Sequence, residues 1–367
     1  MNGPLRIVHT EASCGWGGQE IRILEESAGM IARGHSVHLL CPPEAPILAA
    51  AHARGIPATA LAIGRKRLGP LWSLRRWLVT HEFDVINTHS STDSWLAAIA
   101  ARTLGKPAPV VRTRHISAPV GDRMTTRWLY THGARHVVTT GEALRASLIR
   151  ENGIPAAQLT SVPTGINEQR FAPASRAEAR AALGLPAAVP IIGIVATLRD
   201  WKGHTVLIEA LARLRHQEAV LLMVGDGPYR PSIEAAIARH GVAARVIAPG
   251  NQQDVRPWLH AMDIFALPSW ANEGVPQGIM QAMLCGLPVV STPIGSIEEA
   301  VLDGVTGRIV PPRDAETLAR VLDEFLDDPV QLARYADAGR AHALANFTLD
   351  HMLDRMESIF RAAVAGR

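Results

Sequence analysis

Residues 263–292 read DIFALPSWANEGVPQGIMQAMLCGLPVVST, a stretch that contains one full repeat of a recurring pattern. A short apolar run, DIFALPS, is followed by a Gly/Pro turn, an apolar helix-like segment and a second apolar run, PVVST. Gly286 and Pro288 are typical signals for the end of the helix. Strands and helices in this alternation are typical of a parallel sheet that is covered on both faces.

The same alternation continues through the whole chain. Strand-like runs in the first half include RIVHTEA, SVHLLCP, DVINTHS, PVVRTRH and RHVVTTG, and those in the second include VPIIGIVATL, AVLLMVGDG and RVIAPG. A chain of 367 residues exceeds the size of a single core. We therefore predict two doubly wound α/β domains, residues 1–170 and 188–345, joined by a Pro- and Ala-rich segment near residues 165–188.

The tail, residues 346–367, has the pattern of an amphipathic helix. Met352, Met356 and Ile359 lie at positions i, i+4 and i+7 and so share one face. We expect this helix to cross back to the N-terminal domain.

Composition limits the class of protein. The chain is 47% hydrophobic and 19% charged, which is typical of a globular protein. Its start does not have the pattern of a signal peptide, and no apolar segment approaches the ~18 residues of a membrane span. Three cysteines without a C-x-x-C pair favour a reduced, cytoplasmic setting.

The two halves of the chain differ in charge. Residues 1–167 hold 18 Lys and Arg against 11 Asp and Glu, a balance of +7, and the remainder has a balance of −4. With 3 Tyr, 6 Phe and no recognisable nucleic-acid module, an acidic lipid surface or a phosphorylated ligand is a better partner for the basic half than nucleic acid.

The turn before the helix of the opening stretch allows two interpretations. The free N–H groups at the helix start would favour an anion such as phosphate. A core helix that binds nothing would have the same turn and the same end signals, so this feature alone leaves both interpretations open. Glu273 would repel a phosphate beside it, and we therefore expect it to hydrogen-bond neutral hydroxyls.

Several segments, taken together, resemble the retaining glycosyltransferases of family 4, which have the GT-B fold. The resemblance is carried by VPTGINEQRF, IVATLRDWKGH, LLMVGDGPYRPSIEAAI, GNQQDVRPWLHAMDIFALPS and EGVPQGIMQAMLCGLPVVSTPIGSIEEAV, in that order, and more loosely by GWGGQE, FDVINTH and RTRH. It implies two Rossmann-like domains that face each other across a deep cleft. It also implies transfer of a sugar from a nucleoside diphosphate sugar, as in the synthesis of bacterial cell-envelope polysaccharide or lipopolysaccharide.

The family resemblance assigns roles around Glu273. Glu273 would bind hydroxyls of the donor sugar, and the backbone amides of Gly274 and Val275 would meet the diphosphate. Gln281 stands where the family has a second glutamate that binds the ribose hydroxyls. An amide still bonds two hydroxyls but has no charge, so we expect ribose binding and no acid/base role there.

Two cations are expected at the leaving diphosphate. The family places an arginine five residues before the lysine, where this chain has Thr197, and Arg199 is our candidate for the missing guanidinium. Lys202 matches the family directly. A surface ion pair between Arg199 and Asp200 or another acid is the alternative.

The remaining candidates follow the family more loosely. His115, at the end of PVVRTRH, would face the donor sugar, although a lone histidine at a strand end is often structural. Gly17 and Gly18 would let backbone N–H groups approach a ligand, although a tight strand-to-helix turn explains them as well. Glu299 matches an acid near the diphosphate, and residues 250–255 lie where the family reads the nucleotide base.

We expect neither a metal ion nor another cofactor. The chain has no D-x-D triplet and no His/Cys cluster with metal spacing. In the family-based interpretation, a helix dipole, Arg199 and Lys202 supply the positive charge at the diphosphate.

Residues 64–78, GRKRLGPLWSLRRWL, combine five basic residues with two tryptophans. Leu71, Leu74 and Leu78 share one face that should be core, and Trp72 and Arg76 share another. An anionic membrane interface and an ordinary solvated basic face explain this pattern equally well.

Taken together, the sequence predicts a cytoplasmic or peripheral membrane glycosyltransferase acting on a glycan or a lipid-linked acceptor. A non-catalytic peripheral protein that senses nucleotide sugars is one alternative. A dinucleotide-dependent oxidoreductase is another, although the glycine fingerprint of that class is absent.

Overall fold

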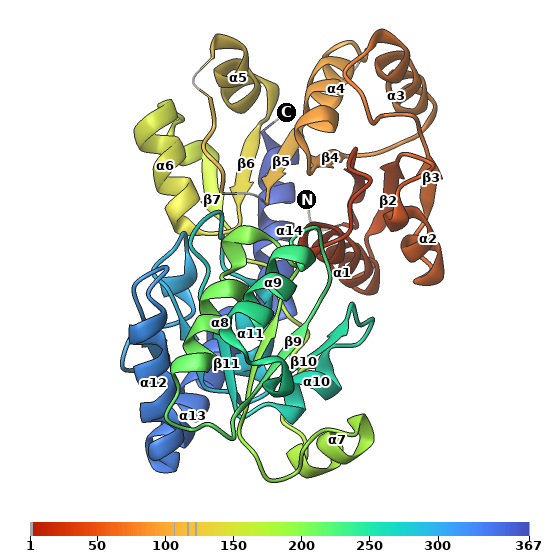
Figure 1. Ribbon diagram of the computed structural model, residues 1–367. Coiled ribbons are helices and arrows are strands. Elements are labelled where there is room, and N and C mark those ends of the chain that lie inside the picture. Colours follow the sequence, from red (N-terminus) through yellow and green to blue (C-terminus); the bar gives the residue numbers. More distant parts are fainter. Residues whose placement is uncertain (1–2, 106, 116, 122, 367) are drawn as a thin grey trace. The chain divides into compact units, whose positions relative to one another are not determined.

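The computed structural model describes residues 3–366 except 106, 116 and 122. The chain forms two compact units, each with its own parallel sheet. Unit 1 contains the residues up to Gly165 and the segment from Leu349 onward, and unit 2 is Ile166–Thr348 (Figure 1). The prediction of two doubly wound α/β domains is confirmed.

The sheet of unit 1 has seven parallel strands in the order β3-β2-β1-β4-β5-β6-β7. Strands reach outward from β1 in both directions, so the winding reverses between β1 and β4. The strands are β1 Arg6–Thr10, β2 Ser36–Cys41, β3 Ala58–Ala60, β4 Val85–Thr88, β5 Val110–Arg114, β6 His136–Thr139 and β7 Leu159–Ser161.

Helices cover both faces of this sheet. One face packs against α1 and α14, and the other packs against α3 and α4. The helices are α1 Gly18–Ala32, α2 Pro46–Ala53, α3 Leu68–Thr80, α4 Ser91–Arg102, α5 Met124–Trp128, the π-helix η1 Leu129–Gly133, α6 Glu142–Asn152, the 3-10 turn η2 Ala156–Gln158 and α14 Leu349–Ala365.

Helix α14 is the predicted C-terminal helix, and it does pack back on the N-terminal domain. Met352, Met356 and Phe360 are buried against apolar side chains of β1, β4 and β5. Gly29 of α1 lets α14 come close, because a Cβ at Gly29 would lie 2.4 Å from Leu353 Cδ1. Ile359 is only partly buried at the edge of this contact.

The sheet of unit 2 has six parallel strands in the order β10-β9-β8-β11-β12-β13. Its winding reverses between β8 and β11. All five residues of β9 are buried, as expected for a strand with both faces covered. The strands are β8 Ile191–Val195, β9 Val220–Val224, β10 Val246–Gly250, β11 Ile264–Leu267, β12 Val289–Ser291 and β13 Gly307–Ile309.

Helix α8 of unit 2 contacts α9 and α12, and α11 contacts α13 around one continuous core. The helices are α7 Arg176–Leu183, α8 His204–Arg213, α9 Arg230–His240, α10 Arg256–Ala261, α11 Gln277–Leu284, α12 Ala315–Asp327 and α13 Pro329–Asn346. Short 3-10 turns are η3 Asp200–Lys202, η4 Ala243–Arg245 and η5 Ile297–Glu299.

Residues 166–187, which we expected to act as a linker, lie within unit 2. The reason is Arg180 of α7, a buried side chain that donates to the backbone oxygens of Ala261, Ala187 and Val189 and pairs with Asp263. The two points where the chain passes between units are bonded to each other, because Ile166 N donates to Phe347 O at 2.9 Å. No helix in the described part of the chain is both long and apolar enough to cross a bilayer.

Candidate functional site

In an open α/β sheet, ligands bind beyond the carboxyl ends of the strands, where the winding reverses. In unit 2 this position lies between β8 and β11. The loop after β8 leads through Arg199 to η3, and the loop after β11 leads through Glu273 to α11. Five of the ten candidates predicted from the sequence lie on these two loops, namely Arg199, Lys202, Glu273, Gly274 and Val275.

The two loops meet in an ion pair between Lys202 and Glu273. Lys202 Nζ donates to Glu273 Oε1 at 2.7 Å and to Oε2 at 2.9 Å. Ser269 Oγ also donates to Oε1, at 2.6 Å. The Glu273 side chain is 5% exposed and that of Lys202 is 20% exposed, so the ammonium is the more accessible partner.

Further bonds fasten the loops to each other. Trp270 N donates to Trp201 O at 2.8 Å, and Trp270 Nε1 donates to Asp200 O at 3.0 Å. Thr292, after β12, donates its hydroxyl to Ser269 O. The Lys202–Glu273 pair is therefore held by backbone bonds on both sides.

Two glycines permit this close approach. Gly203 has φ +77°, and a Cβ there would lie 2.0 Å from Pro268 O. Gly295 has φ +62°, and its Cβ would lie 1.8 Å from Glu273 O. Any larger residue would collide with backbone at both positions, so the glycines set how near the neighbouring loops come to Glu273.

Helix α11 begins beside this pair. Its N-cap, Pro276, supplies no side-chain hydrogen bond, and Val275 is buried in the core below. Gln281 is half-buried further along the helix. Gly274 and Val275 thus precede the positive end of a helix dipole, the position that the resemblance assigns to the diphosphate.

Arg199 and Glu299 lie in less constrained positions. Arg199 is exposed, and its guanidinium carbon is 5.8 Å from the centroid of the Trp201 ring. Among the described residues no carboxylate lies within ion-pair distance of Arg199, so the alternative of a surface ion pair is not what the structure contains. Glu299 ends η5, and its backbone oxygen bonds His342 Nε2 at 2.8 Å.

His115 of unit 1 follows β5 and is the outer member of a row of three histidines. His89 Nδ1 lies 3.0 Å from His115 Nε2, and His9 Nδ1 lies 2.8 Å from His89 Nε2. The rings of His9 and His89 are stacked with their centroids 5.1 Å apart. His115 is half-buried, whereas the other two are buried.

The row is neutral at physiological pH. Burial, with a smaller effect of the Arg22 charge, lowers the pKa of His9 to about 3. Burial also lowers the pKa values of His89 and His115 well below the ordinary value. A neutral imidazole donates from one nitrogen and accepts at the other, so three of them form a consistent chain only if all have the same tautomer.

Glu26 is the acid that faces the inner end of that chain, beyond hydrogen-bond distance of His9 Nε2. Its Oε1 is 3.9 Å from His9 Nε2 and accepts from Asn87 Nδ2 at 3.3 Å, while Arg22 Nε is 3.6 Å from Oε2. A carboxylate facing Nε2 favours a proton on that nitrogen. Each ring then carries its proton on Nε2, and His115 is left with an accepting Nδ1.

Gly17 and Gly18 mark the start of α1. The backbone at Gly17 is extended, with φ 179°, so its conformation does not require glycine. A Cβ there would approach only Glu20 Oε2, at 3.8 Å. Close approach of a ligand therefore remains a prediction for this turn.

Sequence reasoning missed several members of these sites. His89 closes the segment FDVINTH, but nothing in the sequence links it to His9 or to Glu26; the pairing of β1 with β4 and the packing of α1 bring the three together. Ser269 could have been found from its place four residues before Glu273. Gly203 could have been suspected from its place directly after Lys202.

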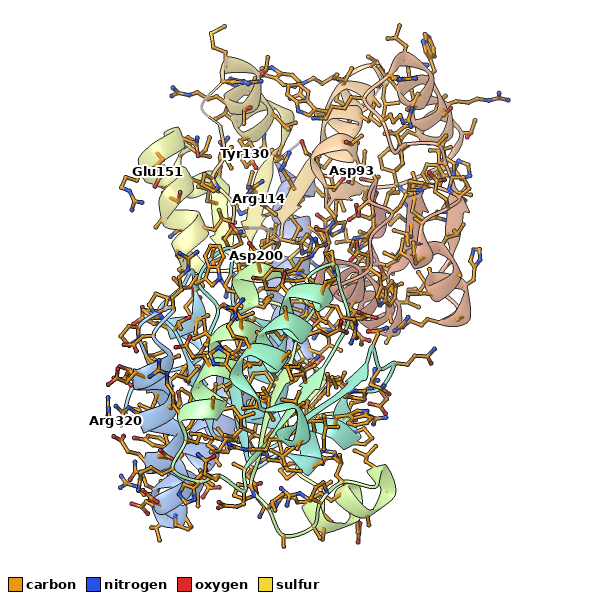
Figure 2. All side chains as sticks on the ribbon, in the orientation of Figure 1. Asp93, Arg114, Tyr130, Glu151, Asp200 and Arg320 are labelled. Carbon is orange, nitrogen blue, oxygen red and sulfur yellow. The ribbon has the colours of Figure 1, made fainter. Side chains whose placement is uncertain are left out.

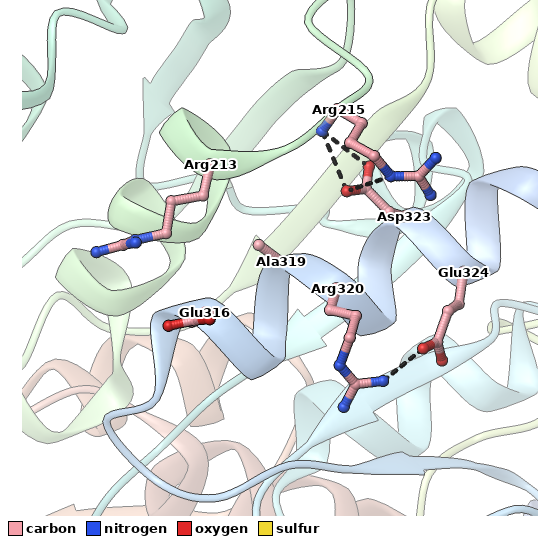
Figure 3. Close-up of a pocket in the computed structure, with 7 residues that line it drawn as sticks. All are labelled: Arg213, Arg215, Glu316, Ala319, Arg320, Asp323 and Glu324. Atoms are coloured by element: carbon pink, nitrogen blue, oxygen red, sulfur yellow. Dashed lines mark hydrogen bonds and ion pairs between the residues drawn. The ribbon is translucent and has the colours of Figure 1, made fainter.

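A surface hollow of about 560 Å³ lies elsewhere on unit 2, between the end of α8 and α12 (Figure 3). All three of its arginines are already paired: Arg213 with Glu209, Arg215 with Asp323 and Arg320 with Glu324. This hollow is therefore a weaker candidate than the β8/β11 edge. Within the described residues, no group of three His, Cys, Asp or Glu side chains could hold a metal ion.

Comparison with protein families agrees with the two units. Residues 16–170 match the model described as glycosyltransferase family 4, and residues 189–328 match the model described as glycosyl transferases group 1. These ranges contain all the candidate site residues.

Curated relatives include glycosyltransferases of two kinds. A GDP-mannose-dependent alpha-(1-6)-phosphatidylinositol monomannoside mannosyltransferase of Mycolicibacterium smegmatis is 35% identical over 205 residues, 53% of each chain. A D-inositol 3-phosphate glycosyltransferase of Xylanimonas cellulosilytica is 28% identical over 396 residues, 96% of this chain and 93% of the relative. The chain thus spans about half the length of the first relative and nearly all of the second.

Solved structures share the fold along the whole chain. A glycosyltransferase from Rickettsia africae has a TM-score of 0.87 at 21% identity, covering 98% of this chain and 99% of its own. HepE of Anabaena, solved in complex with UDP, has a TM-score of 0.87 at 22% identity, covering 98% and 100%. At this identity the likeness shows the fold.

A first prediction concerns the glycine next to Glu273. Gly295→Ala should destabilise unit 2 by more than Gly241→Ala, because both glycines have positive φ but a Cβ at Gly241 meets nothing within 4 Å. The control should lose only the ~1–2 kcal/mol of left-handed backbone. Urea unfolding measures both, and equal losses would show that the loops can move apart freely.

A second prediction concerns His9. Below pH 6.5 the unfolded chain protonates this residue, whereas the native state does not until the pH approaches 3. The stability that neutral His9 contributes is therefore complete above pH 6.5 and is lost as the pH falls from 6.5 towards 3. The loss is about 1.4 kcal/mol per pH unit.

Urea unfolding of the parent and of His9→Asn at about pH 7.5 and about pH 5.5 tests this, since the parent should lose about 1.4 kcal/mol more than the variant. The same pH dependence in both proteins would mean that His9 is protonated in the native state.

Proposed function

The chain belongs to family 4 of the glycosyltransferases and has the GT-B fold, and on that premise we propose that it moves a sugar from a nucleoside diphosphate sugar to a hydroxyl of a glycan or lipid-linked acceptor. The observation that carries the proposal is the Lys202–Glu273 pair at the winding reversal of unit 2, beside the start of α11. Family membership argues against a dinucleotide-dependent oxidoreductase.

In the proposed complex, Lys202 and α11 hold the diphosphate. An ammonium has three donors, and Glu273 uses two of those of Lys202, so one remains for a phosphate oxygen. Arg199, exposed and without a carboxylate partner among the described residues, supplies a bidentate fork. Because these groups and the helix dipole supply positive charge, the proposal requires no metal ion.

Glu273 and His115 orient the sugar. Glu273 accepts from Lys202 and Ser269, and we assign its carboxylate to a hydroxyl of the donor sugar. His115 would accept a hydrogen bond from a hydroxyl of the sugar at Nδ1. Gln281 binds the ribose hydroxyls, Gly274 and Val275 offer backbone amides to the diphosphate, and Glu299 lies near it.

We propose retention of configuration by attack on the same face of the sugar. The bond from the anomeric carbon to the diphosphate breaks, a bond to the acceptor oxygen forms, and the acceptor's proton passes to the leaving phosphate oxygen. Glu273 is a poor nucleophile for a double displacement, because hydrogen bonds from Lys202 and Ser269 engage its carboxylate.

The names of the relatives suggest which classes of donor and acceptor to test. One relative uses GDP-mannose and a phosphatidylinositol glycolipid, another uses an inositol phosphate, and HepE was solved with UDP. We propose an acceptor of the cell envelope. Residues 250–255 are our candidates for base selection.

We also propose that the protein acts in the cytoplasm, at the inner face of the cell membrane. Leu74 and Leu78 of α3 are buried in the core as predicted, whereas Trp72 is 64% exposed and Leu68 is 74% exposed. Arg76 is exposed on the same side as Trp72. Basic and apolar side chains in this arrangement suit an anionic lipid surface.

Lys202→Ala should reduce turnover more than tenfold, because removing a charge that stabilises the leaving group commonly costs ~2–4 kcal/mol. Transfer from radiolabelled UDP, GDP and ADP sugars in a cell extract provides the measurement. Arg320→Ala, in the surface hollow, should change turnover by less than about twofold. A thermal melt checks folding, since the substitution leaves Glu273 without its cation.

Unchanged kinetics of Lys202→Ala would reject the role of Lys202. Tight donor binding without transfer or hydrolysis in the parent would favour the non-catalytic sensor.

Replacing Trp72 and Arg76 by Ser should weaken co-sedimentation with anionic vesicles, since each basic residue at such a surface contributes ~1 kcal/mol. Val330 and Arg334 of α13, also exposed and also four residues apart, give the matched double Ser control. Arg75 is left in place because its guanidinium bonds Thr103. Equal sedimentation of both variants and the parent would eliminate the membrane surface from the proposal.

A further inference from the structure

Arg112 of β5 is a buried cation with unsatisfied donors. The residue is 5% exposed, and its Nε and Nη1 have no hydrogen-bond partner in the described structure. Its guanidinium carbon lies 4.5 Å from the centroid of the Tyr130 ring, a cation–π contact that satisfies no N–H group. Buried guanidinium groups are normally paired, so we expect this one to bind an anionic group.

Asp93, whose charge acts on Arg112, is not that partner. Its Oδ1 accepts from Ser90 N at 2.8 Å and from Ser90 Oγ at 2.5 Å. Its Oδ2 accepts from Thr10 Oγ1 at 2.7 Å and from His89 N at 2.9 Å. Four bonds fill the lone pairs of a carboxylate, so Asp93 serves the start of α4 and leaves Arg112 without an acceptor.

Two more cations act on the same region. The charge of Arg114 opposes that of Arg112, and Arg112 in turn lowers the pKa of Lys66 after the larger effect of burial. Arg114 donates to Tyr130 Oη at 3.3 Å, and its buried Nε is also without a partner. Figure 2 shows Arg114 beside Tyr130, with Asp93 at the neighbouring end of α4.

Lys66 forms the accessible side of the cluster. It is exposed, donates from Nζ to Ser91 Oγ at 3.1 Å and lies 5.8 Å from the Trp95 ring centroid. Its stem is flexible, so Nζ can leave Ser91 Oγ and bind an anion instead.

We propose that Arg112, Lys66 and Arg114 form a binding site for a phosphate ester of the acceptor substrate. Arg112, Lys66 and Arg114 bring three cations together, the Asp93 carboxylate is saturated by other hydrogen bonds, and a guanidinium fork fits two oxygens of a phosphate. This inference rests on the proposed function, because only a glycosyltransferase would bind the phosphate ester as its acceptor substrate. The site is formed by residues of unit 1, on β5 and the loop that contains Lys66, whereas Lys202 belongs to unit 2.

The test uses glycerol 3-phosphate as a free phosphate ester and phosphatidylinositol in phosphatidylcholine vesicles as a lipid-borne one. Binding of each is measured by calorimetry or sedimentation in the Lys202→Ala background, so that phosphate held by the donor loops does not contribute. We expect Arg112→Gln and Lys66→Gln to weaken binding at least about tenfold. Arg112→Lys should give an intermediate loss, because it keeps the charge and loses the fork.

Arg150→Gln is the control, since Arg150 is exposed on α6 of the same unit and pairs with Glu151. Loss of glycerol phosphate binding in the Arg112 variants supports a free phosphate, and loss only with vesicles supports a lipid headgroup. Equal binding of both probes by the parent, Lys66→Gln and Arg112→Lys would overturn the site, and so would no binding at all. Lys66 is exposed, so Lys66→Gln remains informative if Arg112→Gln fails to fold.

Sugar transfer is scored separately. Arg112-dependent phosphate binding without any sugar transfer would keep the site and refute the enzyme. If sugar is transferred but phosphate binding is unchanged in the Arg112 and Lys66 variants, the enzyme activity is supported and the phosphate site is refuted.

Discussion

The loops after β8 and β11 can hold Lys202 against Glu273 only because their backbones approach more closely than a Cβ allows. Gly203 brings η3 onto Pro268, and Gly295 brings the loop after β12 onto the carbonyl of Glu273. A carboxylate that is 5% exposed would be costly without partners, and Lys202 and Ser269 supply them. The pair is thus a product of backbone packing and does not depend on flexible side chains finding each other.

In unit 1, neutral histidines replace the ion pair as the buried polar groups at the winding reversal. At its winding reversal the buried side chains are imidazoles, which burial keeps neutral and which can therefore donate and accept in turn. Glu26 and Arg22 lie beside His9 at the buried end of the row. They form an ion pair with no net charge, and its carboxylate favours a proton on His9 Nε2. The orientation of His115 is consequently fixed from within the core of unit 1, through His89 and His9.

Much of this could be predicted from sequence, because strand and helix periodicity and the short motifs around Lys202 and Glu273 are local features. The alternation of strand-like and helix-like segments predicted both sheets, and the amphipathic pattern of the tail predicted α14. The row of histidines could not be predicted, since His9 and His89 are 80 residues apart and meet only through the pairing of β1 with β4. Gly203 and Gly241 look alike in sequence and differ only in what lies within 4 Å of them. The boundary was predicted near residues 165–188, and the units divide at Gly165/Ile166. That the rest of this segment belongs to unit 2 could not be predicted, because nothing in the sequence links Arg180 to Asp263.

The two sheet edges differ in how their cations are paired. In unit 2 the central cation, Lys202, is matched by an acid, so an anionic ligand is attracted by one free donor and a helix dipole at a defined place. In unit 1 the Asp93 carboxylate is saturated by hydrogen bonds at the start of α4, and Nε and Nη1 of Arg112 have no acceptor in the described structure. In the two proposals, an anion would therefore meet one free ammonium donor beside a helix start in unit 2, and unbonded guanidinium donors in unit 1.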